Sequence, residues 1–132
     1  MILLDTQILI WMRTADGRLG RRARRRIDRG LQQGHLAVSG ISFWEIAMLQ
    51  EKGRLEIRQD VAAWRRTLLR DGLVEVPVDG AIGIRATRLA GFHSDPADRL
   101  IVATALEGHR LLTADRRILD WPGKLSRIDA TE

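Results

Sequence analysis

Short apolar runs alternate with longer amphipathic segments along the whole chain. The apolar runs span three to six residues and are bounded by polar or turn residues, as expected for strands buried on both faces of a parallel sheet. We predict strands over residues 2–4, 36–39, 73–78, 111–113 and 125–128. Pro77 lacks a backbone N–H, so the third strand is expected to end there or to lie at an edge.

The segments between these runs carry apolar residues at helical spacing. Leu19, Ala23, Ile27 and Leu31 recur every four residues, which predicts an amphipathic helix over residues 20–33 that Gly34 ends. Further helices are predicted over residues 6–12, 42–51 with Ser42 as N-cap, 60–70, 80–89 and 95–107, with a helical turn at 118–121. Strands that alternate with helices predict an α/β fold, a three-layer α/β/α sandwich around a short parallel sheet. We expect one domain over residues 1–132.

The composition narrows the class of protein. The chain has 132 residues, no cysteine and a net charge of +5, so disulfides and thiolate metal sites are excluded. The charge suggests a polyanion or an acidic protein as partner, with good solubility alone as the alternative explanation. The first residues, MILLDTQILIW, lack a basic leader, and no apolar run approaches the roughly 20 residues that span a bilayer. We therefore expect a cytoplasmic protein without a membrane segment.

Four acidic residues fall where such a sheet places its sites, outside the carboxyl ends of the strands. Asp5 follows the first predicted strand and Asp115 follows the fourth. Glu45 lies in the first turn of the helix after the second strand, and Asp98 in the first turn of the helix before the fourth. We predict that these four carboxylates lie close together.

Each acid also has a purely structural interpretation. Asp5 and Asp115 are suited to turns or helix caps, and Asp95 before Pro96 fits an N-cap, which would leave Asp98 in the first turn, facing the helix dipole. Helical phase argues against this interpretation, because Asp98 and Glu45 each share a face with apolar residues. Arg99 lies about 100° around the helix from Asp98 and is not an obvious partner for it.

Several carboxylates in one place repel one another, and a divalent cation relieves that repulsion. Oxygen ligands without cysteine or histidine suit Mg²⁺ or Mn²⁺. His35, His93 and His109 show no ligand spacing, and we interpret them as loop residues. The residues alone therefore leave a metal site and a set of helix caps as alternatives.

Four motifs in order resemble one known family. LLDT at 3–6, SFWEIA at 42–47, DPADRLIVATA at 95–105 and LLTAD at 111–115 are similar to the PIN-domain ribonucleases, and most similar to the VapC-like toxins of type II toxin–antitoxin systems. The resemblance implies an endoribonuclease that cleaves RNA with one or two Mg²⁺ or Mn²⁺ ions, is silenced by a cognate antitoxin and forms a homodimer.

The resemblance also assigns roles to residues. It makes Asp5, Glu45, Asp98 and Asp115 the catalytic acidic quartet and metal site, with Asp5 and Asp98 as the most direct ligands. Thr6, Thr113 and Asp95 would support the site, Asp95 as a helix cap. Gln7 stands where many relatives have histidine.

Residues 18–29 carry seven arginines in twelve positions. Arg22, Arg25 and Arg26 would bind RNA phosphates or an acidic segment of an antitoxin, or the helix would simply face solvent. Trp11, Trp44, Trp64 and Trp121 are expected in the core or an interface rather than as platforms for bases.

Two other functions compete with a nuclease. A non-catalytic RNA- or protein-binding module on the same fold is the main alternative, although such a module would not need four converging acids. A receiver or phosphatase-like domain is disfavoured, because the first strand ends in DTQ rather than in paired acids.

Overall fold

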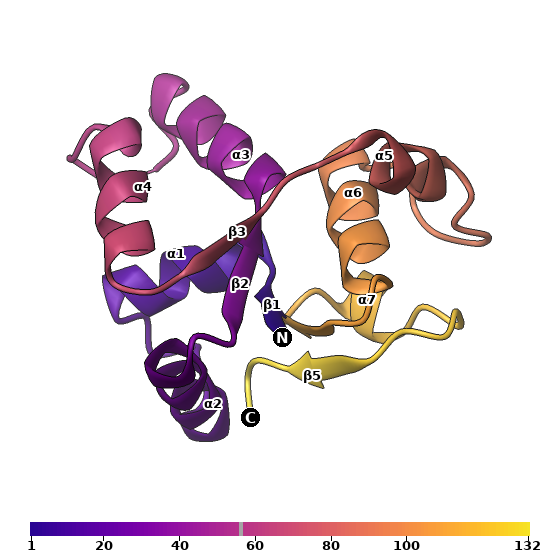
Figure 1. Ribbon diagram of the computed structural model, residues 1–132, viewed down its shortest axis with the longest axis horizontal. Coiled ribbons are helices and arrows are strands. Elements are labelled where there is room, and N and C mark those ends of the chain that lie inside the picture. Colours follow the sequence, from indigo (N-terminus) through magenta and orange to yellow (C-terminus); the bar gives the residue numbers. More distant parts are fainter. Residues whose placement is uncertain (56) are drawn as a thin grey trace.

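Five parallel strands form the centre of the molecule, in the order β3-β2-β1-β4-β5 (Figure 1). The computed structural model describes residues 1–55 and 57–132. The strands are β1 (Ile2–Leu4), β2 (Leu36–Ser39), β3 (Val74–Val76), β4 (Arg110–Thr113) and β5 (Arg127–Asp129). Leu4 pairs in register with Val38 and Leu112. Because all neighbours are parallel, the five carboxyl ends lie at one edge of the sheet and the five amino ends at the other.

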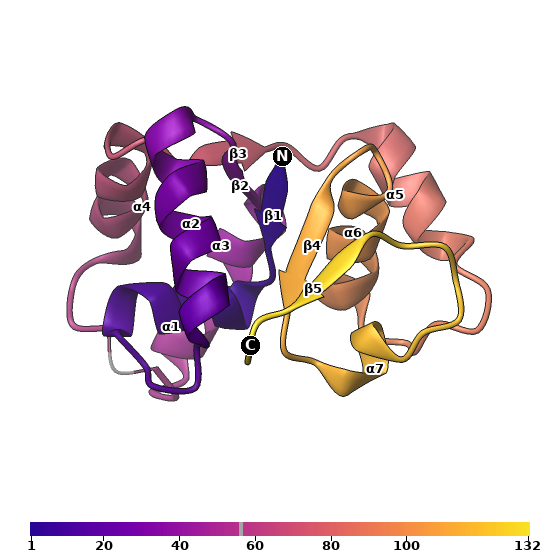
Figure 2. The ribbon, with the colours of Figure 1, turned by 90° about the horizontal axis from the view of Figure 1, so that it is seen from below.

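Helices cover both faces of this sheet. They are α1 (Thr6–Thr14), α2 (Arg21–Gln33), α3 (Gly40–Glu51), α4 (Val61–Arg70), α5 (Gly80–Thr87), α6 (Pro96–Ala105) and α7 (Arg116–Leu119). Figure 2 shows α1 to α4 on one side of β1 and β4, and α5 to α7 on the other. The prediction of an α/β/α sandwich around a parallel sheet is confirmed, and none of the helices within the described residues has the length and apolarity to cross a bilayer.

The pleat of the strands divides the core into two parts. Leu4 and Leu112 pack among the side chains of α1, α2 and α4, whereas Leu3 and Leu111 pack with α6, Phe92 and Trp121. Successive strand residues point to opposite faces, so a run of consecutive leucines serves both layers. This explains why the strands have continuous apolar runs rather than alternating patterns.

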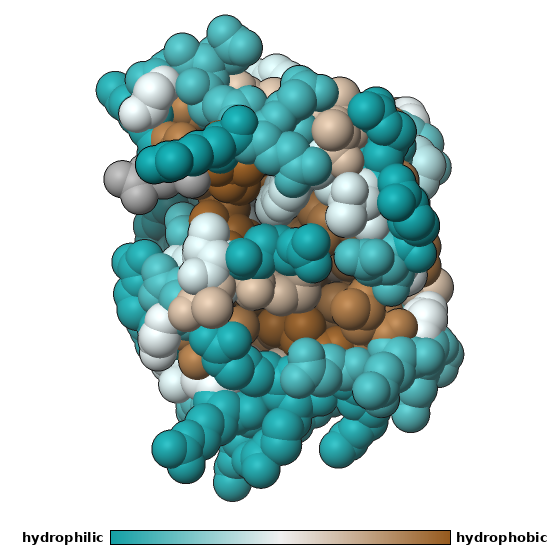
Figure 3. All heavy atoms as spheres, turned by 90° about the vertical axis from the view of Figure 1, so that its left-hand side faces the viewer, coloured by the Kyte–Doolittle hydropathy of each residue, from teal (hydrophilic) through white to brown (hydrophobic). Residues whose placement is uncertain are grey.

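The surface formed by α1 to α4 is hydrophilic around its border. Figure 3 shows a band of hydrophilic side chains over α2 along the lower edge, below a hollowed apolar area. Leu19, Ala23 and Ile27 are buried, while most arginines of α2 are exposed. The predicted amphipathic helix is thus confirmed.

One local prediction was wrong. Ser39, not Ser42, caps α3: its side chain accepts a hydrogen bond from the Ile41 N–H at 3.2 Å. Strand β2 passes directly into α3 with no loop, so the capping serine lies within the apolar run of the strand. Trp11, Trp64 and Trp121 are buried in the core, one of the two places expected for them, whereas Trp44 is 55% exposed, which leaves an interface as its expected place.

Candidate active site

A cleft of about 340 Å³ opens at the carboxyl ends of β1 and β4. These neighbouring strands lie at the point where the order of the sheet reverses, which is where sheets of this kind place their sites. All four predicted acids line the cleft: Asp5, Glu45, Asp98 and Asp115. The lining also includes Asp95, and Arg117 is its one cationic side chain among the described residues.

Asp5 is the most deeply placed of these acids, with only 6% of its surface exposed. One carboxylate oxygen accepts a hydrogen bond from the Thr6 N–H at 2.8 Å, and the other accepts from the Thr113 hydroxyl at 2.7 Å. Burial, together with repulsion from Asp98 and Asp115, raises the pKa of Asp5 to about 6, against the lowering effect of the two hydrogen bonds. Asp5 also caps α1, so a capping role does not prevent the same residue from lining the cleft.

Glu45 is held by a small hydroxyl network. The Thr6 hydroxyl lies 2.5 Å from Glu45 Oε1 and 2.8 Å from the Ser42 hydroxyl. Burial, and then repulsion from Asp5, Asp98 and Asp95, raises the pKa of Glu45 to about 7, although the hydrogen bond from Thr6 opposes this shift. Ser42 therefore supports the site instead of capping a helix.

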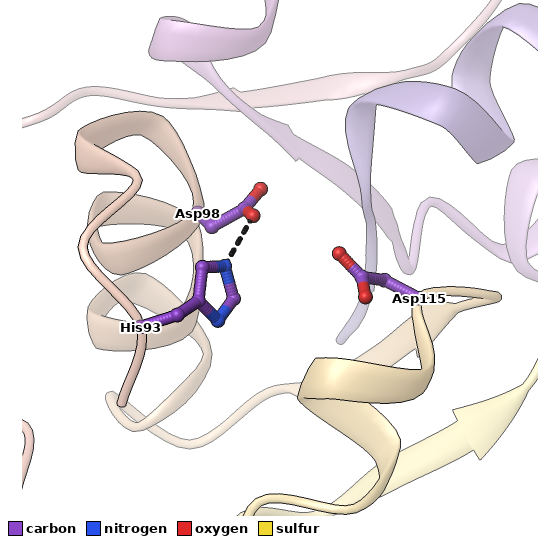
Figure 4. A group of neighbouring side chains, drawn as sticks. All are labelled: His93, Asp98 and Asp115. Carbon is purple, nitrogen blue, oxygen red and sulfur yellow. Dashed lines mark hydrogen bonds and ion pairs between the residues drawn. The ribbon is translucent and has the colours of Figure 1, made fainter. Parts of the chain in front are cut away.

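Asp98 lies beside a histidine that the sequence did not assign to the site. His93 Nε2 is 2.7 Å from Asp98 Oδ2 (Figure 4). Burial raises the pKa of Asp98, although the hydrogen bond to His93 lowers it. Asp95 accepts a hydrogen bond from the Asp98 N–H at 2.9 Å and so caps α6.

His93 lies in a loop, as its sequence position indicated, but its side chain lies beside the predicted acids. His93 does precede α6, but its ring stacks on Phe92 with centroids 4.3 Å apart and turns toward Asp98. Ligand atoms of His93, Asp98 and Asp115 all lie within 4.8 Å of one another. Helical spacing cannot reveal this group, because His93 and Asp115 lie in loops on either side of α6 (Figure 4).

Arg117 is the second residue that the sequence did not reveal. Its guanidinium lies 3.0 Å from Asp115 Oδ2 and 3.5 Å from Asp98 Oδ2. Burial by itself would raise the pKa of Asp115, but hydrogen bonds from Arg117 outweigh this effect, and the pKa is lowered. Arg99 instead donates to backbone carbonyls of Ala86, Phe92 and His93, consistent with the prediction that it does not pair with Asp98.

The chemistry of this donor set fits a hard divalent cation. Asp5, Asp98 and Asp115 offer carboxylate oxygens, and His93 offers a ring nitrogen that is oriented by Asp98. Three of the four acids have raised pKa values, as expected where negative charges are crowded and partly buried. Oxygen donors of this kind are the ligands that Mg²⁺ and Mn²⁺ prefer.

The predicted arginines do not line this cleft. Arg22, Arg25 and Arg26 lie on α2, and Arg26 lines a different hollow at the amino ends of the strands. Gln7 and the buried Trp11 line the acidic cleft, and Trp44 is exposed beside Glu45. The structure thus gathers the acids and leaves the arginine helix apart from them.

The chain is similar to known proteins over almost its full length. A family model described as PIN domain matches residues 2–124. The chain is 36% identical over 119 residues to Ribonuclease VapC22 of Mycobacterium tuberculosis (strain ATCC 25618 / H37Rv), covering 89% of this chain and 88% of that protein.

Solved structures share the fold at lower identity. A toxin–antitoxin complex from Klebsiella pneumoniae has a TM-score of 0.64 and 21% identity, covering 98% of both chains. VapBC2 from Rickettsia felis, bound to a DNA fragment from its promoter, has a TM-score of 0.65 and 17% identity, covering 92% of this chain and 94% of that chain.

Proposed function

The chain belongs to the PIN-domain family, among the VapC-type ribonucleases of type II toxin–antitoxin systems, and from this we propose that residues 1–132 act as one metal-dependent endoribonuclease domain. The observation that carries the proposal is the convergence of four carboxylates from separate segments on one cleft. They do so in a chain whose net charge is +5. Helix capping alone does not require these acids to meet.

The proposed reaction is hydrolysis of an RNA phosphodiester bond. Asp5, Asp98 and Asp115 would hold one or two Mg²⁺ or Mn²⁺ ions, and His93 is placed to assist. When bound, such an ion lowers the pKa of a water molecule and stabilises charge on phosphate oxygens. The chain itself supplies orientation, because hydrogen bonds from Thr6 and Thr113 fix both oxygens of Asp5.

Glu45 has a separate task in this proposal. With its pKa raised to about 7 by burial, it can take up or release a proton at neutral pH, as general acid–base catalysis requires. The Thr6 hydroxyl holds Oε1 in place. The other carboxylate oxygen remains for substrate or water.

We also propose a cognate antitoxin and a homodimer as the partners of this chain. The Klebsiella neighbour is a toxin–antitoxin complex and the Rickettsia neighbour is VapBC2, and this supports the first partner. A non-catalytic RNA-binding module remains the alternative function. It is less favoured, because five acids around one cleft repel a phosphate backbone unless a cation lies between them.

Substitution of Asp98 by Asn tests the function directly. The purified chain should cleave RNA with Mg²⁺ or Mn²⁺ and not with EDTA. Asp98→Asn should reduce the cleavage rate by about 100-fold or more, because even outer-shell changes at metal sites cost roughly 10- to 100-fold. The melting temperature with EDTA should change little, since Asp95 caps α6 and accepts a hydrogen bond from the Asp98 backbone N–H, which the substitution leaves in place.

Asp79→Asn is the matched control. Asp79 caps α5 by accepting from the Ile82 N–H at 2.8 Å and does not line the cleft. Its cleavage rate should equal that of the unchanged chain. Wild-type activity in Asp98→Asn would return Asp98 to a structural role and favour the binding module.

A further inference from the structure

The amino ends of the strands surround a second, basic hollow. It has a volume of about 640 Å³ and is lined by Arg26, Arg29, Arg110 and His35, with Ile2 and Gly30 beside them. We call these residues the amino-end hollow. It lies at the edge of the sheet opposite to the acidic cleft, since Ile2 and Arg110 begin β1 and β4 while Asp5 and Asp115 follow the same strands.

Two distant parts of the chain build this hollow. Arg26 and Arg29 are three residues apart on α2 and so share a face of that helix. Arg110 comes from β4, where it pairs in register with Ile2. Ile2 in turn donates its N–H to the His35 carbonyl at 2.9 Å. The sheet therefore fixes the position of Arg110, and helix α2 fixes the positions of Arg26 and Arg29.

The charges of these arginines are not balanced within the described part of the chain. No carboxylate lines the hollow. The side chains of Arg26, Arg29 and Arg110 make no hydrogen bond or ion pair with residues 1–55 or 57–132, whereas Arg65 and Arg116 pair with acids. Three guanidinium groups around one open hollow repel one another, and an anionic partner would relieve that repulsion.

We propose that the amino-end hollow binds backbone phosphates of the RNA substrate, away from the bond that is cleaved. This proposal rests on the proposed ribonuclease function. The planar guanidinium fork matches phosphate geometry, and the acidic cleft needs a basic surface elsewhere to offset its repulsion of RNA. The two sites lie at opposite ends of strands that are buried in the core. An RNA must therefore pass around the outside of the molecule to contact both sites, which a folded RNA can do and an oligonucleotide of a few nucleotides in the cleft cannot.

Charge removal at the hollow tests this proposal. In the full chain carrying Asp98→Asn, binding of an RNA hairpin and of a short single-stranded oligonucleotide is measured over a range of salt concentrations. Arg26→Gln, Arg29→Gln and Arg110→Gln together should weaken hairpin binding about tenfold at low salt. They should also reduce the slope of log affinity against log salt by roughly 2 to 3, because each lost phosphate contact accounts for about 0.7–0.9. Oligonucleotide binding should not change.

Two matched variants separate local contacts from net charge. Arg66, Arg70 and Arg88 are exposed and lie on or next to α4 and α5, so their change to Gln removes the same charge elsewhere and should leave the slope nearly unchanged. Replacing Arg26, Arg29 and Arg110 by Lys should retain most of the slope. Melting temperatures of all variants check that the fold is intact.

The outcomes distinguish a failure of the hollow as an RNA site from a failure of the proposed ribonuclease function. An unchanged hairpin slope in the Gln variant, or an equal loss in both Gln variants, would overturn the hollow as an RNA site. Normal RNA binding with lost binding of an acidic protein partner would overturn it in favour of that partner. If the unchanged chain neither binds nor cleaves RNA, the ribonuclease function itself fails.

Discussion

The two ends of one small sheet carry opposite chemistry. Among residues 1–55 and 57–132, five acids and a single arginine line the cleft at the carboxyl ends, while three arginines and no carboxylate line the hollow at the amino ends. Between them lie strand residues such as Leu3 and Leu4, which are fully buried. A parallel sheet keeps the two edges apart, so each can take its own charge without neutralising the other.

The two ends also differ in how their charged groups are held. Asp5 is buried and both its oxygens are fixed by hydrogen bonds. Arg29 and Arg110 are exposed. A cation in a site needs fixed ligands, whereas a phosphate backbone is attracted by charge over a wider surface. The acidic end should therefore respond to metal and pH, and the basic end to salt.

Metal binding should have the largest effect on stability. Excess Mn²⁺ is expected to raise the melting temperature by about 10 °C relative to EDTA, since a ligand at 100 times its Kd adds roughly 2.7 kcal/mol to the folded state. Scanning calorimetry measures this change. It should disappear when Asp5 and Asp98 are both changed to Asn, and persist when the three arginines of the amino-end hollow are changed to Gln. Equal melting temperatures with EDTA and Mn²⁺ would count against a metal site.

The pH dependence without metal should be the next largest effect. Burial raises the pKa of Asp5 from 3.8 to about 6 and that of Glu45 from 4.5 to about 7. The folded chain then keeps protons that the unfolded chain releases, so the stabilising contribution is complete below the ordinary pKa values and is lost as the pH rises through 6 and 7. For Asp5 this loss is on the order of 3 kcal/mol over the whole pH range, of which about half falls between pH 5 and pH 8.

Urea unfolding at pH 5 and pH 8 with EDTA measures this loss. Asp5→Asn should be less sensitive to pH and should be more stable than the unchanged chain at pH 8. Asp79→Asn should retain the full sensitivity, because Asp79 lies outside the cleft. A free energy of unfolding that rises from pH 5 to pH 8 would contradict the crowding of charge at this end.

Sequence patterns predicted the acidic end better than the basic end, for a physical reason. Asp5 and Asp115 follow strands, and parallel strands bring their ends together, so local positions implied a shared site. Arg110 and Arg26 line the same hollow only because β4 pairs in register with β1, and no local spacing in the sequence relates these two arginines. From the arginine pattern of residues 18–29 we selected Arg22 and Arg25, which do not line the hollow. We did not select Arg29, which does line it.

His93 and Arg117 were not predicted as site residues, for a related reason. His93 and Arg117 reach the acidic cleft from segments before α6 and within the short α7. Neither belongs to a long periodic element, so no spacing rule applied to them. Ser39 was missed as a cap because its position in a strand and its capping of α3 overlap.

Substitution of Arg117, the arginine at the acidic end, is expected to give the smallest of these effects. Its guanidinium lies near Asp115 and Asp98, so it competes for the carboxylates that would hold a cation. Arg117→Gln is expected to strengthen Mn²⁺ binding by roughly three- to fivefold, a modest effect because the Arg117 side chain is exposed and its ion pairs are screened by solvent. Arg116→Gln is a closely matched control, because Arg116 is similarly exposed but pairs with Asp120 and Asp129. Isothermal titration calorimetry with Mn²⁺ compares the two. Weaker binding in Arg117→Gln alone would mean that Arg117 positions Asp115 for the metal, and the single arginine of the acidic end would then be a support for the site rather than a competitor.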